Sequence, residues 1–226
     1  FWNDVFTFNK NWAHSLCDLF IKENLNIEWD CQTRADQINE EILRKMKQAG
    51  CVAVMLGVES GSEEVLRSVE KKLTKDQIRD AFKMLHEIGF VTTATFTLGQ
   101  PWDTRETIQE TIDFAKEINP DFGMFYVSTP FPGSPLWRMC EEKGIKPSTD
   151  WANYRILPFE IDLDKFIPVF DTSKLSIDDL RKFIKTAQID FQMGRLRGGR
   201  KNLIKGIKNI IDIMKLVFFR TKSPAQ

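Results

Sequence analysis

Apolar residues follow two alternating patterns along the first two thirds of the chain. Short runs of apolar or β-branched residues predict strands over 27–31, 51–58, 90–98 and 122–128. Apolar residues spaced three and four apart predict helices over 10–25, 37–49, 63–69, 74–89, 104–118 and 135–143. Residues 1–9, ahead of the first helix, look like the end of one further strand.

This alternation of strands and helices predicts right-handed β-α-β units around a parallel sheet. The strand spacing favours an α/β fold of the partial parallel (β/α) barrel type, with a doubly wound open sheet as the alternative. Neither a GxGxxG fingerprint nor a P-loop is present, which weakens the nucleotide-binding form of that alternative. The nearly continuous apolar run 51–58 is typical of a strand buried on both faces.

The pattern changes after about residue 147. Residues 147–175 look irregular, and helices are predicted over 176–193 and 200–219. We therefore expect a partial barrel over 1–146 and a C-terminal irregular and helical extension over 147–226.

Charge sets the end of the chain apart. The totals balance at 32 basic and 32 acidic residues, but nine Lys and Arg and one acid lie from Arg195 onward. The helix at 200–219 is thus basic and amphipathic, so 195–219 either docks on the barrel, which we favour, or contacts an anionic membrane surface. No aromatic-plus-basic platform for nucleic acid accompanies it.

The remaining composition points to a cytoplasmic protein. The four cysteines form neither a C-x-x-C pair nor a disulfide framework, so we expect buried, reduced thiols and no metal site built from them. No apolar run approaches the ~20 residues that a membrane span needs. The chain begins with Phe1 and without a signal peptide, and we expect it to be a partial product.

In a parallel barrel, functional side chains lie at the carboxyl ends of the strands. Glu59 follows the apolar strand directly and stands between Gly57 and Gly61, which permit a tight turn and close approach of a ligand. Its carboxylate suits an amine or ribose hydroxyls. The alternative is that Glu59 caps the next helix.

Two further strand ends carry charged candidates. Arg34 offers a planar donor for a carboxylate or phosphate, or it forms an ion pair with Asp30 or Asp36. Asp4 either accepts from an ammonium group or caps the helix at 10–25. Both histidines fall within predicted helices, away from any strand end.

Five segments in this order resemble the radical SAM enzymes, most closely the branch whose members often carry an N-terminal cobalamin-binding domain. The likeness covers residues 1 to about 145, and each segment alone would be a weak signal. The segments are FWNDVFTFN (1–9), IEWDCQTRAD (27–36), GVESGSEEVL (57–66), TFTLGQPWDT (95–104) and STPFPGSPLW (128–137).

The resemblance implies a cofactor set. Members hold a 4Fe-4S cluster on a C-x-x-x-C-x-x-C loop, and the open iron of the cluster binds S-adenosylmethionine. One electron, from a donor such as flavodoxin or ferredoxin, cleaves that cofactor to methionine and a 5′-deoxyadenosyl radical, which takes hydrogen from the substrate. Methyl transfer, oxidation and rearrangement all occur on this scaffold. The branch also implies cobalamin.

The resemblance assigns cofactor contacts to seven residues: Asp4, Arg34, Glu59, Ser60, Gly99, Gln100 and Pro101. Asp4 matches an acidic position near the methionyl amine, and Arg34 matches a contact to the cofactor carboxylate. Glu59 and Ser60 match positions near the ribose and the methionyl group. The turn at 99–101 matches the segment whose backbone approaches adenine.

A proline-rich loop matches the part of the family fold that faces substrate. Its residues in this sequence are Thr129, Pro130, Pro132 and Gly133. The substrate itself is not implied.

The sequence departs from the family pattern in three places. Asn3 stands where an acid is common, and Gln100, Trp102 and Asp103 replace the more usual Leu, Gly and Glu. The cluster cysteines are absent, and no spacing of the four present replaces them, so this chain alone should be inactive. A catalytically inactive barrel acting as a binding module and a non-radical barrel lyase are the alternatives.

The reading frame ahead of Phe1 tests this interpretation. We expect a C-x-x-x-C-x-x-C motif within about 60 residues upstream, the length of one to two β-α units. Sequencing the gene checks it. A genuine start codon with no such motif would favour the inactive binding module.

Overall fold

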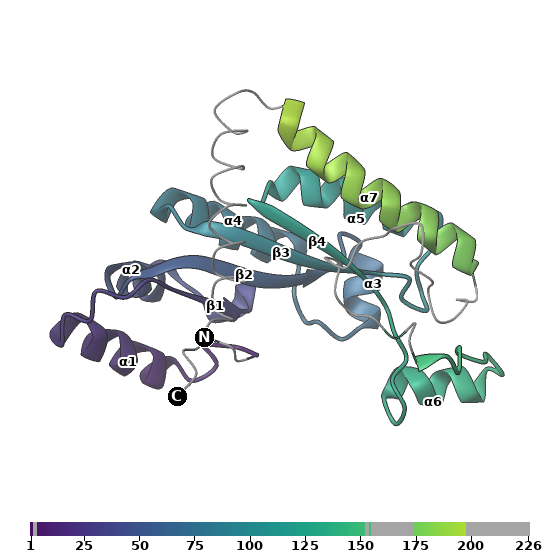
Figure 1. The fold of residues 1–226 in the computed structure, drawn as a ribbon, viewed down its shortest axis with the longest axis horizontal. Helices are drawn as coiled ribbons and strands as arrows, with labels where there is room; N and C mark the ends of the chain where they lie inside the picture. The colour runs from purple at the N-terminus through teal and green to yellow at the C-terminus, as the bar shows by residue number, and fades with distance from the viewer. Residues whose placement is uncertain (2–3, 152–153, 155–173, 198–226) are drawn as a thin grey trace, which may run out of the picture.

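The computed structural model of the chain describes residues 1, 4–151, 154 and 174–197. Within these residues, four strands form one parallel sheet in the order β1-β2-β3-β4 (Figure 1). The strands are β1 (Trp29–Thr33), β2 (Cys51–Glu59), β3 (Val91–Leu98) and β4 (Phe122–Val127). Neighbours in sequence are neighbours in the sheet, as in a singly wound barrel, whereas a doubly wound sheet reverses its order.

Helices connect the strands at the positions that the sequence predicts. They are α1 (Lys10–Lys22), α2 (Glu40–Gln48), α3 (Glu63–Ser68), α4 (Lys75–Ile88), α5 (Arg105–Ile118), α6 (Pro135–Glu142) and α7 (Ile177–Arg197), with a 3-10 turn η1 (Ala35–Gln37). Local signals fix several starts. Thr74 and Gln77 close the expected capping box of α4, and Ser134 caps α6 ahead of Pro135.

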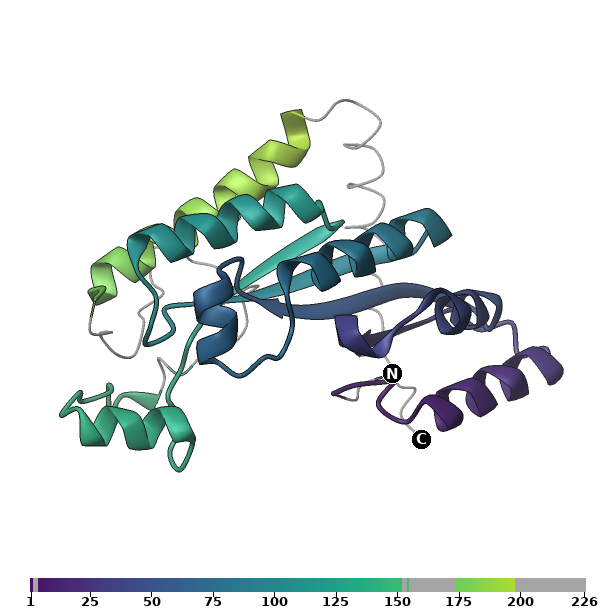
Figure 2. The same cartoon turned by 180° about the vertical axis from the view of Figure 1, so that it is seen from behind.

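The larger helices form one layer. α1, α2, α4, α5 and α7 contact one another in that order, while α2, α4, α5 and α7 each pack on a strand. Seen from behind, α4 and α5 lie across the sheet on the same side (Figure 2). Consecutive right-handed crossovers produce this arrangement, because each returns the chain over the same face.

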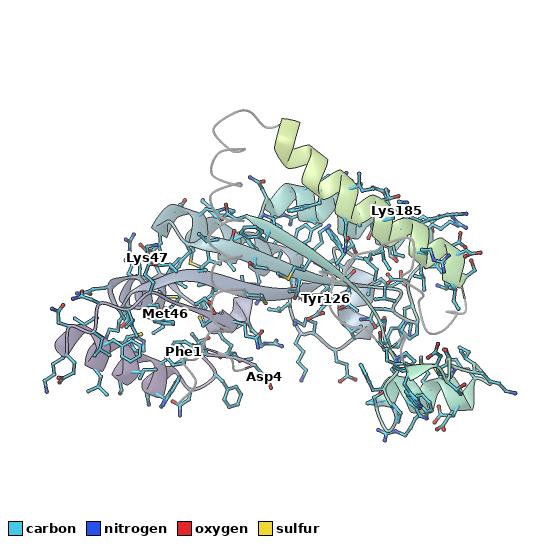
Figure 3. The ribbon with its side chains drawn as sticks, viewed as in Figure 1. Phe1, Asp4, Met46, Lys47, Tyr126 and Lys185 are labelled. Carbon is cyan, nitrogen blue, oxygen red and sulfur yellow. The ribbon has the colours of Figure 1, made fainter. Side chains whose placement is uncertain are left out.

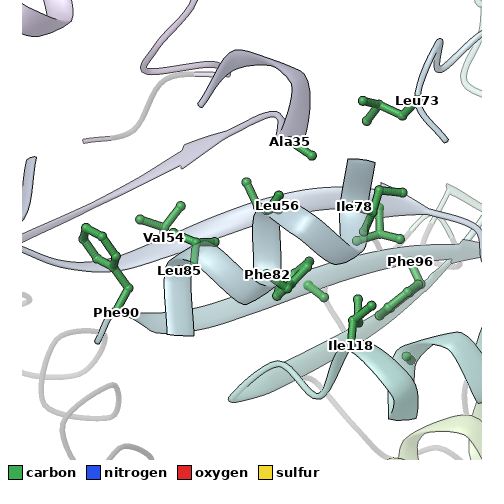
Figure 4. Close-up of a cluster of buried hydrophobic side chains, with 14 of the residues drawn as sticks. Ala35, Val54, Leu56, Leu73, Ile78, Phe82, Leu85, Phe90, Phe96 and Ile118 are labelled. Carbon is green, nitrogen blue, oxygen red and sulfur yellow. The ribbon is translucent and has the colours of Figure 1, made fainter. Parts of the chain in front are cut away.

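The core lies between that helix layer and the sheet. Val54, Leu56 and Val58 of β2 are buried. The close-up shows Val54 and Leu56 beside Phe82 and Leu85 of α4 (Figure 4). The intervening residues of β2, such as Met55, are only half-buried. The expectation that 51–58 is buried on both faces is therefore wrong for one face, which none of the described helices covers.

The strand end expected within residues 1–9 is absent from residues 4–9, while residues 2–3 lie outside the described part of the chain. Residues 4–9 form turns, with the Phe8 amide bonded to the Val5 carbonyl at 3.2 Å. The Phe6 amide donates to the Gln32 carbonyl at 2.9 Å, and the N-terminal ammonium group of Phe1 donates to the Asp30 carbonyl. Two separate bonds do not make the ladder that a strand requires, so residues 4–9 lie against β1 as an apolar plug, with Phe6 fully buried.

The first helix of the predicted extension, α7, joins the same core. Leu180 of α7 lies over Gly99, and Phe191 lies over Gly123 of β4 and meets Phe125 edge-on at 6.1 Å. α6 instead stands apart from the sheet, packed with Ile145 and Tyr154 around Cys140 (Figure 1). The domain boundary at 146 stays a prediction.

The predicted helix at 200–219 lies outside the described residues, as does most of the 195–219 segment expected to dock on the barrel or to contact a membrane. Among the helices that the structure does describe, none is both long and apolar enough to cross a membrane.

Replacing Phe191 tests the docking of α7. Phe191→Ala should lower the free energy of unfolding by about 3 kcal/mol or more, because a buried aromatic ring leaves a cavity. Ile189→Ala is the control, since Ile189 lies on the same helix and is 45% exposed. Urea denaturation measures both, and equal losses would contradict the packing of α7 on β4.

Candidate functional site

A cavity of about 370 Å³ opens on the face of the sheet opposite the helix layer. Every strand contributes to its lining, including Thr33 of β1, Gly57 of β2, Thr95 of β3 and Tyr126 of β4. Loops contribute three charged groups, from Asp4, Arg34 and Lys71. The structure thus brings together three predicted site residues, Asp4, Arg34 and Glu59, and adds one that was not predicted.

Glu59 ends β2 and turns its carboxylate into the cavity. One oxygen, Oε1, accepts from Lys71 Nζ at 2.8 Å, and the other, Oε2, accepts from Thr97 Oγ1 at 2.9 Å. The side chains of Glu59 and Lys71 are only 28% and 14% exposed. These two bonds replace the alternative of a helix cap, because α3 begins after Ser62.

The backbone at Glu59 is strained in a way that serves this orientation. Its φ is +70°, in the left-handed region, and the β2–β3 register shifts between Gly57 and Glu59. A residue with a side chain pays about 1–2 kcal/mol for that region. The bulge leaves Val58 in the core and turns the carboxylate over the open face.

Arg34 forms the ion pair with Asp36 that the sequence offered as one alternative, and it also lines the cavity. Its Nε and Nη2 donate to the two carboxylate oxygens of Asp36, both at 2.9 Å, and Nη2 also donates to the Lys71 carbonyl at 2.9 Å. Hydrogen bonding to Asp36 raises the pKa of the Arg34 guanidinium, and the same bond lowers the pKa of the Asp36 carboxyl. Arg34 therefore also anchors the loop that carries Lys71.

Lys71 is the residue that sequence reasoning missed. It belongs to the loop between α3 and α4, and it lies in an ordinary charged run with Glu70 and Lys72. The rule that singles out strand ends does not reach it. Its position depends on the fold of that loop, whose neighbours Glu70 and Lys72 take φ values of +53° and +55°.

Gly57 makes room for the ion pair. A Cβ at that position would stand 3.0 Å from Glu59 Oε1 and 3.1 Å from Lys71 Nζ. The pair therefore lies directly over the bare backbone of β2. The groups that approach this glycine belong to the protein itself, so the expected close approach of a ligand stays a prediction.

Asp4 lies beneath the sheet, on the side away from α5 and α7 (Figure 3). It does not cap α1, because Asn9 does so by accepting from the Trp12 amide at 3.0 Å. Of the two roles considered for Asp4, the helix cap is therefore excluded. The other role, accepting a hydrogen bond from an ammonium group, is compatible with its place in the cavity lining.

Ser60 lies outside the cavity lining. It is buried, its hydroxyl bonds to Thr111 Oγ1 of α5 at 3.0 Å, and it accepts from the Ser62 amide at 3.1 Å. These bonds tie the end of β2 to the helix layer. A contact of Ser60 with the cofactor stays a prediction.

The turn from Gly99 to Pro101 also lies outside the lining. Asp103 holds it, accepting from the Gln100 amide at 2.9 Å and from Thr107 Oγ1 at 2.8 Å. Burial raises the pKa of the Asp103 carboxyl. Ser128, at the end of β4, donates to Gln100 Oε1 at 3.3 Å. The turn is thus rigid and joined to the next strand, while its role toward adenine stays a prediction.

The proline-rich loop connects β4 to α6. Thr129 Oγ1 donates to the Val127 carbonyl at 3.0 Å, and Gly133 has a φ of +80°. Thr129, Pro130, Pro132 and Gly133 are absent from the cavity lining, so their contact with substrate stays a prediction.

The cysteines do not fit a metal cluster. Among the described residues, no group of three or more His, Cys, Asp or Glu side chains could hold a metal ion. Cys17 of α1, Cys31 of β1 and Cys51 of β2 are buried in the hydrophobic core. Burial raises the pKa of Cys17 to about 11 and also raises that of Cys51, so these thiols stay protonated and are poor ligands.

Similar proteins share one family. Residues 8–115 match the model of the radical SAM superfamily. The chain is 30% identical over 193 residues to an uncharacterized methyltransferase of Pyrococcus horikoshii, covering 85% of this chain and 40% of that protein. It is 34% identical over 129 residues to the anaerobic magnesium-protoporphyrin IX monomethyl ester cyclase of Rubrivivax gelatinosus, covering 56% of this chain and 23% of the cyclase. The chain spans less than half the length of either relative.

Solved structures agree on the fold. The radical S-adenosylmethionine methyltransferase TsrM of Kitasatospora setae superposes with a TM-score of 0.58 at 17% identity, over 64% of this chain and 32% of that one. The coproporphyrinogen III oxidase HemN of Escherichia coli superposes with a TM-score of 0.57 at 19% identity, over 83% of this chain and 38% of that one. The four-stranded sheet is therefore part of the partial barrel of the radical SAM type.

A double-mutant cycle tests the ion pair in the cavity. For Glu59→Gln and Lys71→Met we expect a coupling of about 1 kcal/mol in the free energy of unfolding, since both groups are largely withdrawn from water. The exposed pair of Glu40 and Arg44, with side chains 64% and 65% exposed, is the control and should couple much more weakly. Urea denaturation supplies the four energies for each pair. Equal couplings would contradict the buried geometry.

Proposed function

The chain belongs to the radical SAM superfamily, and from this premise we propose that the complete protein cleaves S-adenosylmethionine reductively to start radical chemistry on a substrate. One observation carries the proposal for this chain. Glu59 projects into a cavity at the strand ends, beside two cations, within the segment that matches the family. This is where a parallel barrel places its ligand.

The groups around the cavity fit the cofactor. S-adenosylmethionine has an ammonium group, a carboxylate and ribose hydroxyls, and it supplies the 5′-deoxyadenosyl radical when reduced. Glu59 and Asp4 would accept hydrogen bonds from the ammonium and hydroxyl groups, and Lys71 and Arg34 would offer positive charge to the carboxylate. Bare backbone at Gly57 lets the ligand lie close to the sheet.

The chain contributes binding and orientation. Thr97 fixes one oxygen of Glu59 and so sets the plane of the carboxylate. We propose that Ser60 and the turn from Gly99 to Pro101 contact the cofactor beyond the lining of the cavity; Asp103 holds that turn by accepting from the Gln100 amide.

The cluster belongs elsewhere in the complete protein. No cysteine of this chain fits it, so we propose that residues outside this sequence hold the 4Fe-4S cluster and that a donor such as flavodoxin or ferredoxin reduces it. Buried thiols support a reducing, cytoplasmic location.

The similar proteins suggest the class of reaction but not the substrate. Their names include methyltransferases and a cyclase, so we propose methyl transfer, oxidation or rearrangement, with Thr129, Pro130, Pro132 and Gly133 facing the substrate. The TsrM structure has cobalamin bound, and cobalamin is a proposed second cofactor of the complete protein. Docking of 195–219 on the barrel is favoured over membrane contact.

Glu59→Ala in the reconstituted full-length protein tests the cofactor site. We expect S-adenosylmethionine to bind roughly 10- to 100-fold more weakly, the effect of losing a hydrogen bond to a charged group, with iron content unchanged. Anaerobic calorimetry and iron analysis measure the two quantities. Glu41→Ala, on the exposed face of α2, is the control. Unchanged affinity would remove Glu59 from the site.

A further inference from the structure

We infer that Tyr126 is a catalytic residue of this site, a hydrogen-atom donor to carbon radicals that form in the cavity. The inference rests on the proposed function, because such radicals arise only if the complete protein cleaves S-adenosylmethionine reductively. It concerns a residue to which neither the strand-end rule nor the family pattern assigns a role.

The Tyr126 hydroxyl lies over the middle of the open face. Phe125 is buried in the core, so the alternation of β4 puts Tyr126 on the other side of the sheet, where it lines the cavity (Figure 3). The hydroxyl donates to Met124 Sδ at 3.4 Å, which directs it back along β4. Met124 pairs in register with Thr95, and Thr95 pairs with Gly57, so the hydroxyl lies near the bare backbone that forms part of the cavity lining.

A ligand held by Glu59 can reach Tyr126. Thr97 lies between the two residues, since it pairs in register with Tyr126 and donates to Glu59 Oε2 at 2.9 Å. Two strand spacings, roughly 10 Å, separate β2 from β4. S-adenosylmethionine is longer than this, so a cofactor bound at Glu59 and lying across β3 brings its reacting atoms toward Tyr126.

The hydroxyl keeps its hydrogen and is weakly held. Burial raises the pKa of Tyr126, so the phenol stays protonated at neutral pH. Its acceptor is a thioether sulfur, which accepts hydrogen bonds weakly. The hydroxyl of Tyr154 instead donates to the Ser148 carbonyl at 2.9 Å. Little free energy is therefore lost when the Tyr126 hydroxyl turns from Met124 to a ligand.

Hydrogen transfer from a phenol to a carbon radical is favourable, because the O–H bond of a phenol is weaker than the C–H bond that forms. The O–H bond of Tyr126 breaks, a C–H bond forms on the radical carbon, and a neutral phenoxyl radical remains. One electron from a donor of the flavodoxin or ferredoxin class and one proton from water then restore the phenol. A substrate radical that must end as a closed-shell product takes its hydrogen in this way.

Other groups of the cavity are poorer sources of an exchangeable hydrogen atom. The weak bonds of Gly57 and Met55 are C–H bonds, whose hydrogens do not exchange with water. The hydrogens of Thr95 and Lys71 do exchange, but their O–H and N–H bonds are at least as strong as the C–H bond that would form. The four thiols lie outside the cavity lining. Heavy water therefore marks Tyr126 among the weak bonds of the described lining.

A single turnover in heavy water tests this role without a known substrate. The cluster of the reconstituted full-length protein is reduced with dithionite, excess reductant is removed, and S-adenosylmethionine is added without substrate or thiol. We expect 5′-deoxyadenosine that carries deuterium, measured by mass spectrometry, and a phenoxyl EPR signal that narrows when ring-deuterated tyrosine is incorporated. Tyr126→Phe keeps the ring and removes the O–H bond, so it should lose both the deuterium and the signal.

Tyr154→Phe is the matched control, because Tyr154 is the other tyrosine of the chain and lies outside the cavity lining. It should keep the deuterium and the signal, and melting temperatures show that each variant is folded. Unlabelled 5′-deoxyadenosine from the unaltered protein, or label and signal that persist in Tyr126→Phe, would overturn the role of Tyr126. The proposed function survives that result, since 5′-deoxyadenosine still forms. If the unaltered protein forms none, the proposed function fails and this inference with it.

Discussion

The one-sided winding of the sheet is the constraint on which the other features depend. Each crossover returns over the same face, so α2, α4, α5 and α7 cover one side of β1-β2-β3-β4 (Figure 2). The covered side is mostly apolar, although Thr92 of β3 is buried there beside His86 of α4. The other side faces the cavity, and its alternate residues, from Met55 to Tyr126, stay half-buried and accept polar neighbours. Core and site are therefore two faces of the same four strands.

The end of β2 shows how the two faces are kept apart. Val58 is buried under the helices, and the register shift after Gly57 turns Glu59 to the open side despite its left-handed backbone. Its two hydrogen bonds offset the strain. Ser60 then turns back to α5, so three successive residues serve the core, the cavity and the helix layer. A charged pair withdrawn from water is stable here because each partner has a fixed neighbour.

The coverage of β4 follows from packing rather than from chain order. α6 comes directly after β4 but packs around Cys140, away from the sheet. α7, more than thirty residues later, covers the strand through Leu180 and Phe191, which fit over the bare backbone of Gly99 and Gly123.

The sequence by itself determined the parallel α/β order, most element boundaries and the candidates Asp4, Arg34 and Glu59. Periodicity, helix caps and strand ends are local signals, because each depends only on residues that are close together in the sequence. Only the tertiary structure decided that residues 4–9 form turns, that β2 is open on one face and that Lys71 meets Glu59. Those outcomes depend on which distant groups meet across the fold. A lysine twelve residues past a strand end carries no local sign of facing a cavity, because a loop between helices puts it there.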